Sequence, residues 1–109
     1  MAGKFEIFRG DDRQYYFRLK AANGESILAS EAYRSKASAE NGIAAVRVDA
    51  TLERRYERRR SPAGYSFVLK GANGEPMGRG EVYESSSGRD SGIESVRENA
   101  PAAAVEDLA

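Results

Sequence analysis

Hydrophobic and polar residues alternate along two short segments of the chain, residues 15–20 and residues 65–70. The first segment reads Tyr-Tyr-Phe-Arg-Leu-Lys and the second reads Tyr-Ser-Phe-Val-Leu-Lys. Because successive side chains of a strand point to opposite faces of a sheet, this period of two predicts two half-buried strands. We expect the shared Tyr-x-Phe-x-Leu positions to face the core.

The two segments belong to a longer internal repeat. Residues 15–50 match residues 65–100 at a constant offset of 50 without a gap, and 16 of the 36 aligned pairs are identical. Upstream, a slip of one residue sets Phe5-Glu6 against Tyr56-Glu57. Self-similarity at a fixed period is typical of duplicated structural units, so we expect both copies to contain the same elements.

A hairpin is predicted in each copy, because Asn-Gly stands at residues 23–24 and 73–74 between strand-like segments. Both residues tolerate the positive φ that a type I′ turn requires. A third strand should follow the turn, from Ile27 to Tyr33 in the first copy. The matching part of the second copy contains Pro76, Gly78 and Gly80, which predicts a strand start with a bulge or bend.

One strand should precede each alternating segment, from Phe5 to Arg9 and from Arg54 to Arg60. After the third strands the period changes to that of a helix. Ser35 and Ser85 are suitable N-caps, and Pro101 should end the second helix. The helical stripe consists of Ala39, Ile43, Val46 and Ala50 in the first copy and of Ile93, Val96 and Ala100 in the second.

These elements predict an α+β fold made of two tandem β-β-β-α repeats related by pseudo-two-fold symmetry, with helices packed on an antiparallel sheet. We expect a single domain over residues 1–109, because half the chain buries too little surface to be stable alone. The first repeat is residues 1–50 and the second is residues 51–101. Residues 102–109 are predicted to form a loose acidic C-terminal tail.

The composition excludes several kinds of catalytic and metal-binding site. The chain has 109 residues, 17 Lys and Arg, 17 Asp and Glu, and no Cys, His or Trp. Without Cys and His it lacks thiolate nucleophiles, disulfides and the commonest metal ligands, so we predict no metal site and no cofactor. The lack of Cys fits a reducing compartment, and no stretch approaches the roughly 20 apolar residues of a membrane span. We therefore expect a cytoplasmic protein.

Three motifs occur twice at matching positions. In the first copy they are Leu-Lys-Ala-Ala-Asn-Gly-Glu at residues 19–25, Glu-x-Tyr-x-Ser at residues 31–35 and Gly-Ile-x-x-Val-Arg at residues 42–47. This set resembles the YegP-like family of bacterial and archaeal proteins, and the resemblance covers nearly the whole chain. It implies a pseudo-symmetric α+β body of two β-β-β-α copies. The family has no established activity, cofactor or catalytic residue, so the resemblance implies no site.

The sharpest candidate for a binding surface is residues 53–60, which read Glu-Arg-Arg-Tyr-Glu-Arg-Arg-Arg. Arg binds phosphate in a fork and Tyr stacks on bases, so this strand and the adjoining sheet face are a candidate polyanion site. A charged edge strand that resists pairing explains the same residues structurally. The candidate binding residues are Arg55, Arg58, Arg59 and Lys70.

The candidate catalytic group is a pair of carboxylates, Glu31 and Glu81, each two residues before a Tyr. Two carboxylates can divide acid and base roles in a hydrolase. Pseudo-symmetry works against this, because acid and base need different pKa values. With Tyr33 and Tyr83, the pair is the basis of an enzyme hypothesis, ranked third.

We therefore expect a non-enzymatic binding or interaction module without catalytic residues. Its partner is unspecified; a protein is one candidate, and we expect no membrane partner. The alternative is nucleic-acid or other polyanion binding through residues 54–60. It ranks second because a dedicated nucleic-acid binder is usually basic, whereas this chain has a net charge of zero. We expect a monomer, since the duplication already supplies a second copy.

Overall fold

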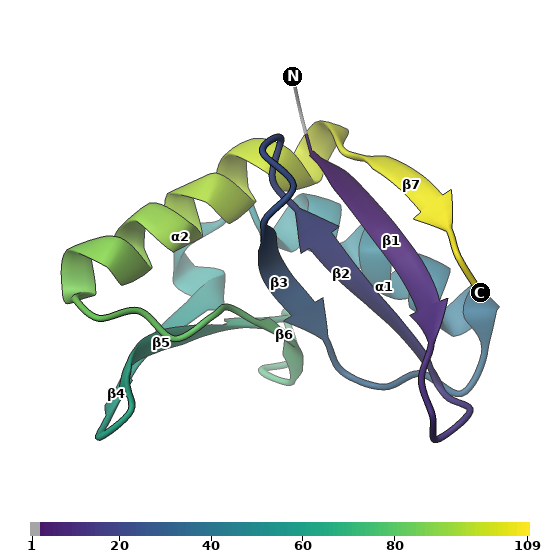
Figure 1. The fold of residues 1–109 in the computed structure, drawn as a ribbon, viewed down its shortest axis with the longest axis horizontal. Coiled ribbons are helices and arrows are strands. Elements are labelled where there is room, and N and C mark those ends of the chain that lie inside the picture. The colour runs from purple at the N-terminus through teal and green to yellow at the C-terminus, as the bar shows by residue number, and fades with distance from the viewer. Residues whose placement is uncertain (1–2) are drawn as a thin grey trace.

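The computed structural model describes residues 3–109, which form a seven-stranded sheet and two long helices (Figure 1). The strands are β1 (Lys4–Arg9), β2 (Tyr15–Lys20), β3 (Ser26–Ser30), β4 (Tyr56–Ser61), β5 (Gly64–Lys70), β6 (Pro76–Arg79) and β7 (Ala104–Asp107). The helices are α1 (Lys36–Asp49) and α2 (Ser86–Asn99), with short 3-10 turns η1 (Glu53–Arg55) and η2 (Ala100–Ala102). The predicted α+β class is confirmed.

The strands are ordered β4-β5-β6-β3-β2-β1-β7 across the sheet. Neighbours pair antiparallel except β1 and β7, which are parallel. The sheet is therefore mixed, and the prediction of a purely antiparallel sheet is wrong at this edge. The prediction of a loose tail is wrong for residues 104–107, because they pair with β1 and the Leu108 N–H donates to the Ile7 carbonyl at 2.8 Å.

Both helices begin where the sequence predicts. The Ser35 side chain accepts from the Ser38 N–H and the Ser85 side chain accepts from the Gly88 N–H, so each satisfies a free donor of the first turn. The chain leaves α2 through η2, where Pro101 stands near the start. In the part of the chain that the structure describes, no helix has the length and apolar character needed to cross a membrane.

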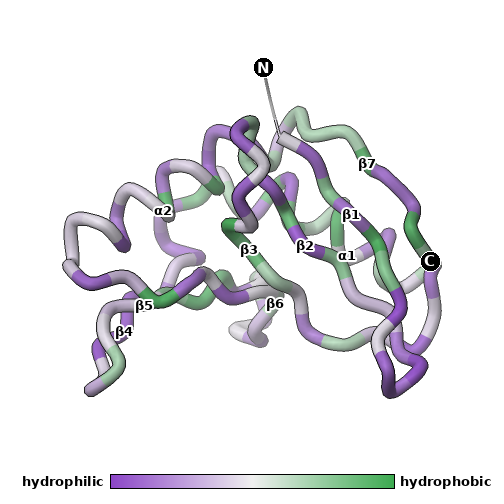
Figure 2. Tube along the Cα trace, in the orientation of Figure 1, coloured by the Kyte–Doolittle hydropathy of each residue, from purple (hydrophilic) through white to green (hydrophobic). Residues whose placement is uncertain are grey.

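A single hydrophobic core runs between the sheet and the two helices. Alternating residues of β1 and β2 point into it, and Figure 2 shows the same alternation of polar and apolar positions along these strands. In Figure 1, α1 lies behind β1 and β2, while α2 runs across the top of the molecule. The largest fully buried side chains are Phe5, Ile7, Phe17, Leu19, Leu28, Phe67, Leu69, Ile93, Val46 and Val96.

The two Asn-Gly hairpins are present, but the predicted type I′ turn is wrong. Gly24 has φ of 88° and Gly74 has φ of 82°, whereas the only non-glycine residue with positive φ within residues 3–109 is Arg13. Each Asn therefore keeps a negative φ. Its side chain explains this, because the Asn23 Oδ1 accepts from the Glu25 N–H at 3.0 Å in a local Asx turn.

The third strands are shorter than predicted. β3 ends at Ser30, and Tyr33 forms an isolated bridge with Tyr15. Register shifts occur between Leu19 and Lys20 and at the matching point between Leu69 and Lys70. The irregularity predicted for the second copy is therefore present in both copies. The strand predicted from Arg54 begins at Tyr56, because residues 53–55 form η1.

Candidate functional site

The face of the sheet opposite the helices is a candidate binding surface, which we call the open face. One row of facing residues crosses all seven strands on this side, since each residue is the register partner of the next. The row consists of Glu106, Glu6, Arg18, Ala29, Arg79, Val68 and Glu57. The cations flanking this row on the same face are Lys4, Lys20, Arg59 and Lys70, and the Glu31 carboxylate binds Arg79 of the row at 3.2 Å.

At the β1–β2 end of the open face, three cations surround the Glu6 carboxylate. Arg18 Nε lies 2.7 Å from it, and the ammonium groups of Lys20 and Lys4 lie at 3.3 and 3.4 Å. The aliphatic stems of these cations cover the carboxylate, so the Glu6 side chain is only 5% exposed. The Arg18 hydrogen bond, supported by the two lysines, lowers the pKa of Glu6 to about 2.

Glu57 on β4 occupies the matching position in the second half of the chain. Its carboxylate accepts from Lys70 Nζ at 2.5 Å and also pairs with the Arg59 guanidinium. These contacts, the one to Lys70 foremost, lower the pKa of Glu57 below its usual value. At both ends of the open face, one carboxylate is therefore shared among more than one cation.

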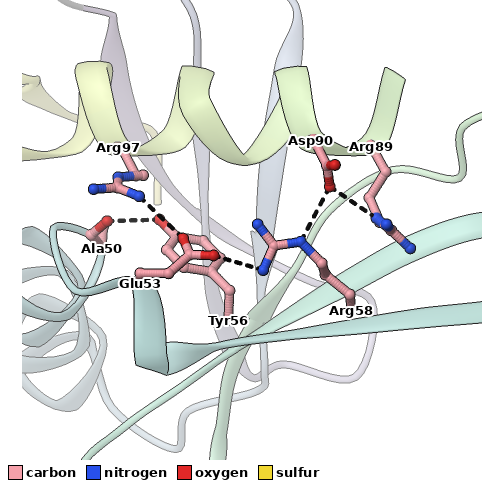
Figure 3. Close-up of polar contacts among 7 residues, drawn as sticks. All are labelled: Ala50, Glu53, Tyr56, Arg58, Arg89, Asp90 and Arg97. Atoms are coloured by element: carbon pink, nitrogen blue, oxygen red, sulfur yellow. Dashed lines mark hydrogen bonds and ion pairs between the residues drawn. The ribbon is translucent and has the colours of Figure 1, made fainter. Parts of the chain in front are cut away.

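The structure brings together only two of the four binding residues predicted from sequence. Arg59 and Lys70 meet at Glu57 on the open face. Arg58 points to the other side of the sheet, where it binds Asp90 of α2 at 3.1 Å (Figure 3). Arg55 lies in η1, half covered, with its Nε 3.0 Å from Asp49.

Arg58 belongs to a chain of ion pairs that ties β4 and η1 to α2 (Figure 3). Arg97 binds Glu53 at 3.0 Å, and Glu53 binds Arg58 at 2.7 Å. The pairing continues from Arg58 through Asp90 to Arg89. The Arg58 guanidinium pairs with carboxylates of η1 and α2. It therefore links elements of the second half of the chain and is less available to an external ligand.

An aromatic pair on the open face was missed by the sequence reasoning. The rings of Phe8 and Tyr16 stack with centroids 5.7 Å apart, and the Arg18 guanidinium lies over Phe8 at 4.4 Å. The Tyr16 hydroxyl donates to Asp12 at 2.5 Å. The signal was available in the alternation of β1 and β2, which puts Phe8 and Tyr16 on the face away from Phe17.

The geometry separates the two carboxylates of the enzyme hypothesis. Ala29 faces Arg79 in the β3–β6 pair, and the Glu31 N–H approaches the Met77 carbonyl at 3.4 Å. Glu81 is four residues beyond Met77 and past the end of β6 at Arg79, so it does not face Glu31 across the β3–β6 pair. Glu31 instead binds Arg79 at 3.2 Å.

The two tyrosines of that hypothesis also lie apart, one against each helix. Tyr33 packs on Gly42 of α1 and Tyr83 on Gly92 of α2. Desolvation raises the pKa of both hydroxyls above the usual value, which leaves them protonated at neutral pH. Tyr33 also borders an open groove of about 430 Å³ between α1 and the hairpin of residues 71–77.

Comparison with known proteins places this architecture in a family. The family model described as Domain of unknown function (DUF1508) matches the chain twice, over residues 11–57 and 63–107. Among curated proteins, UPF0339 protein YegP of Shigella flexneri is 55% identical over 64 residues. UPF0339 protein YegP of Escherichia coli strain K12 is 53% identical over 64 residues. These matches cover 59% of the chain and 58% of each relative.

Two solved structures share the fold over almost the whole chain. The solution NMR structure of the protein of unknown function YegP from E. coli has a TM-score of 0.93 and 45% identity, with 99% of this chain and 94% of that chain covered. UPF0339 protein SO3888 from Shewanella oneidensis has a TM-score of 0.92 and 39% identity, with coverages of 99% and 92%. The resemblance seen in the sequence motifs is confirmed: this chain belongs to the DUF1508 family, together with the uncharacterised YegP-like proteins.

Proposed function

We propose that the protein is a non-enzymatic interaction module that binds an acidic partner through the open face. The observation that carries the proposal is the sharing of one carboxylate by several cations at both ends of that face. Glu6 serves three cations and Glu57 serves two. The cationic groups retain donors that no protein carboxylate uses, and Lys4, Arg18, Lys20, Arg59 and Lys70 are all between 29% and 46% exposed.

The distribution of the remaining charges supports an acidic partner. The chain is neutral overall, so a cationic surplus on the open face requires an anionic surplus elsewhere. Glu40 of α1 and Glu94 and Glu98 of α2 are exposed on the helices. A molecule with separated charges orients an approaching anionic surface toward its cationic side, even when its net charge is zero.

The same proposal treats the molecule as two β-β-β-α repeats, residues 1–50 and 51–101, related by a pseudo-two-fold axis between β3 and β6. The strand order supports it, since β1-β2-β3 and β4-β5-β6 extend in mirrored order from that antiparallel pair. The Tyr15–Tyr33 bridge also recurs as Tyr65–Tyr83. Because the second repeat completes the sheet of the first, we expect a cytoplasmic monomer with the open face free for a partner.

A single-stranded nucleic acid is the second candidate partner. The stacked pair of Phe8 and Tyr16 favours it, because exposed aromatic rings beside cations are the usual platform for unpaired bases. The pair lies at one end of the open face, beside Arg18. We place it second, because the two rings stack on each other and Arg18 lies over Phe8, so their faces are already partly used.

A titration separates these partners. Fluorescence anisotropy is measured for a labelled short peptide of alternating glutamate and threonine, and for labelled mixed-sequence single-stranded DNA, at low and physiological salt. The proposal predicts that the peptide binds and that a Lys70→Gln, Arg79→Gln variant weakens its binding about tenfold, or about 1.4 kcal/mol. A Lys36→Gln, Arg97→Gln variant loses the same charge on the two helices, away from the open face, and should bind like wild type.

Each outcome has a clear reading. Equal weakening by both variants means that net charge alone attracts the peptide, which contradicts a defined surface. Binding of DNA with a steep salt dependence, without binding of the peptide, replaces the proposal with the nucleic-acid candidate. If neither probe binds, both candidates fail.

A further inference from the structure

Strands β1 and β4 begin the two halves of the chain and differ in what lies along their outer sides. β7 pairs along β1 over residues 4–7, so the outer side of β1 is occupied and β7 is the edge strand there. At the other end, β4 pairs with β5 alone, and no strand within residues 3–109 lies along its outer side, which we call the β4 edge. The residues of β4 from Arg58 to Ser61 are exposed. Four consecutive residues of extended chain therefore present one side to solvent.

Backbone hydrogen-bonding groups of β4 point outward along this edge. Arg60 faces Tyr65 in the β4–β5 register, and both backbone groups of Tyr65 bond to Tyr83, at 2.9 and 2.7 Å, on the side away from β4. Residues facing each other in an antiparallel pair either exchange both bonds or neither. Arg60 therefore directs its N–H and C=O away from β5, toward solvent.

Arg58 is oriented in the same way. It faces Phe67, whose carbonyl accepts from the Gly80 N–H at 3.1 Å on the β6 side. At the opposite edge, Ile7 holds the position that matches Arg58, and its carbonyl accepts from Leu108 of the added strand. The β4 edge thus has free backbone N–H and C=O groups at Arg58 and Arg60, and β1 pairs with β7 through backbone groups of the same kind.

The side chains of the β4 edge select an acidic occupant. Arg58, Arg59 and Arg60 are consecutive and exposed. Arg60 forms no ion pair with residues 3–109, and its guanidinium lies 5.3 Å from the Tyr65 ring. Two copies pairing edge to edge would bring these arginines together, and like charges on facing strands destabilise a pair. A second copy is therefore a poor occupant.

The molecule itself contains an example of an acidic strand on a basic edge. β7 reads Ala-Val-Glu-Asp, and its acids are held by lysines of neighbouring elements. Glu106 binds Lys4 at 3.0 Å and Asp107 binds Lys36 at 2.8 Å. All four residues of β7 are exposed, so backbone pairing and these ion pairs hold the strand with little apolar burial.

We propose that the β4 edge binds an extended acidic segment of a partner protein as an added strand. This inference rests on the proposed function, because it specifies how the acidic partner of the open face is held. Outward N–H and C=O groups of Arg58 and Arg60 supply the backbone pairing, as in other complexes formed by strand addition. Acidic side chains at every second position of the segment share one face, and on the open face they pair with Arg59.

The test compares two substitutions that remove the same charge. Arg60→Pro loses the outward N–H, whereas Arg60→Gln keeps it, and the β4–β5 ladder does not use that N–H. Binding of the glutamate–threonine peptide is followed by anisotropy, and exchange of the β4 amides is followed by NMR with and without peptide. A glutamate–threonine peptide methylated at every backbone nitrogen keeps the charge but cannot donate to a strand ladder, and it is the second probe.

Strand addition predicts that Arg60→Gln binds within a few fold of wild type and that Arg60→Pro weakens binding about tenfold or more. It also predicts that the unmodified peptide protects the Arg58 and Arg60 amides from exchange, and that the N-methylated peptide binds weakly. If Arg60→Pro matches Arg60→Gln and the amides gain no protection while Lys70→Gln, Arg79→Gln still weakens binding, strand addition is overturned and the proposed function stands. If the peptide does not bind at all, both are overturned.

Discussion

The Tyr33 side chain lies directly on the backbone of Gly42, and this contact packs α1 against the sheet. A methyl group at position 42 would lie 2.7 Å from the Tyr33 Cζ, inside van der Waals contact. The second half repeats the contact, with a methyl at Gly92 lying 2.5 Å from the Tyr83 Cζ. Each helix therefore has a glycine in its interior because a tyrosine from the end of the third strand occupies the space.

Gly42→Ala should destabilise the protein although alanine is the better helix former. Overpacking against Tyr33 costs about 1–3 kcal/mol, which exceeds the gain of about 1 kcal/mol in helix propensity. Urea unfolding measures the difference. Tyr33→Phe removes the hydroxyl that approaches position 42, so Gly42→Ala should cost less in that background. An equal or larger cost there would show that the hydroxyl is not the cause.

Glu6→Gln should remove a pH-dependent part of the stability. The pKa of Glu6 falls from 4.5 to about 2 on folding, so the ionised carboxylate stabilises the fold above pH 4.5 and this contribution is lost as the pH falls toward 2. The three cations are partly solvated, which limits the contribution to about 2 kcal/mol. Wild type and variant should differ most at neutral pH and converge near pH 2 in urea titrations. A difference that stays constant with pH would contradict this account.

Tyr56→Phe should destabilise the junction between the two halves of the chain. The Tyr56 hydroxyl is buried and donates to the Ala50 carbonyl at 2.7 Å, at the end of α1. Removing it leaves that carbonyl without this bond, at a cost of about 1–2 kcal/mol. Tyr16→Phe is the matched control, because its hydroxyl bonds to Asp12 at the surface. Comparable losses of unfolding free energy in the two variants would contradict the prediction.

Deleting residues 104–109 should uncover the outer edge of β1. The β1 amides that face β7 should then exchange with solvent faster in NMR hydrogen exchange, while the amides between β1 and β2 keep their protection. Glu106→Gln is the control, since it removes only the exposed pair with Lys4. Unchanged protection of the outward β1 amides would mean that β7 contributes little to this edge.

The alternation of the two repeated segments predicted the strands and the buried faces, because a period of two is fixed by backbone geometry. In the structure the same alternation puts Arg58 and Arg59 on opposite faces of β4. The alternation could not predict which face of the sheet each helix covers. The position of α2 depends on tertiary contacts with β4, such as the ion pair between Asp90 and Arg58. The predicted grouping of Arg55, Arg58, Arg59 and Lys70 is therefore spread over three environments.

Two other features could not be predicted from the sequence, because they also depend on tertiary contacts. The residues of β7 carry no clear period, and their strand conformation comes from pairing with β1 and from ion pairs with Lys4 and Lys36. Glu6 reads as an ordinary polar residue of a strand. Its burial arises from cations on β1 and β2, and only the pairing register of the strands brings them to one carboxylate.

The most direct test of the central claim is an NMR titration of the intact, isotopically labelled protein with the short glutamate–threonine peptide. If the open face is the binding surface, the signals that move should be those of β2, β4, β5 and β6 and the guanidinium signals of Arg18, Arg59 and Arg79. Signals of the exposed sides of α1 and α2 should stay in place. Shifts confined to the helices, or to the groove between α1 and residues 71–77, would contradict the assignment of function to the open face.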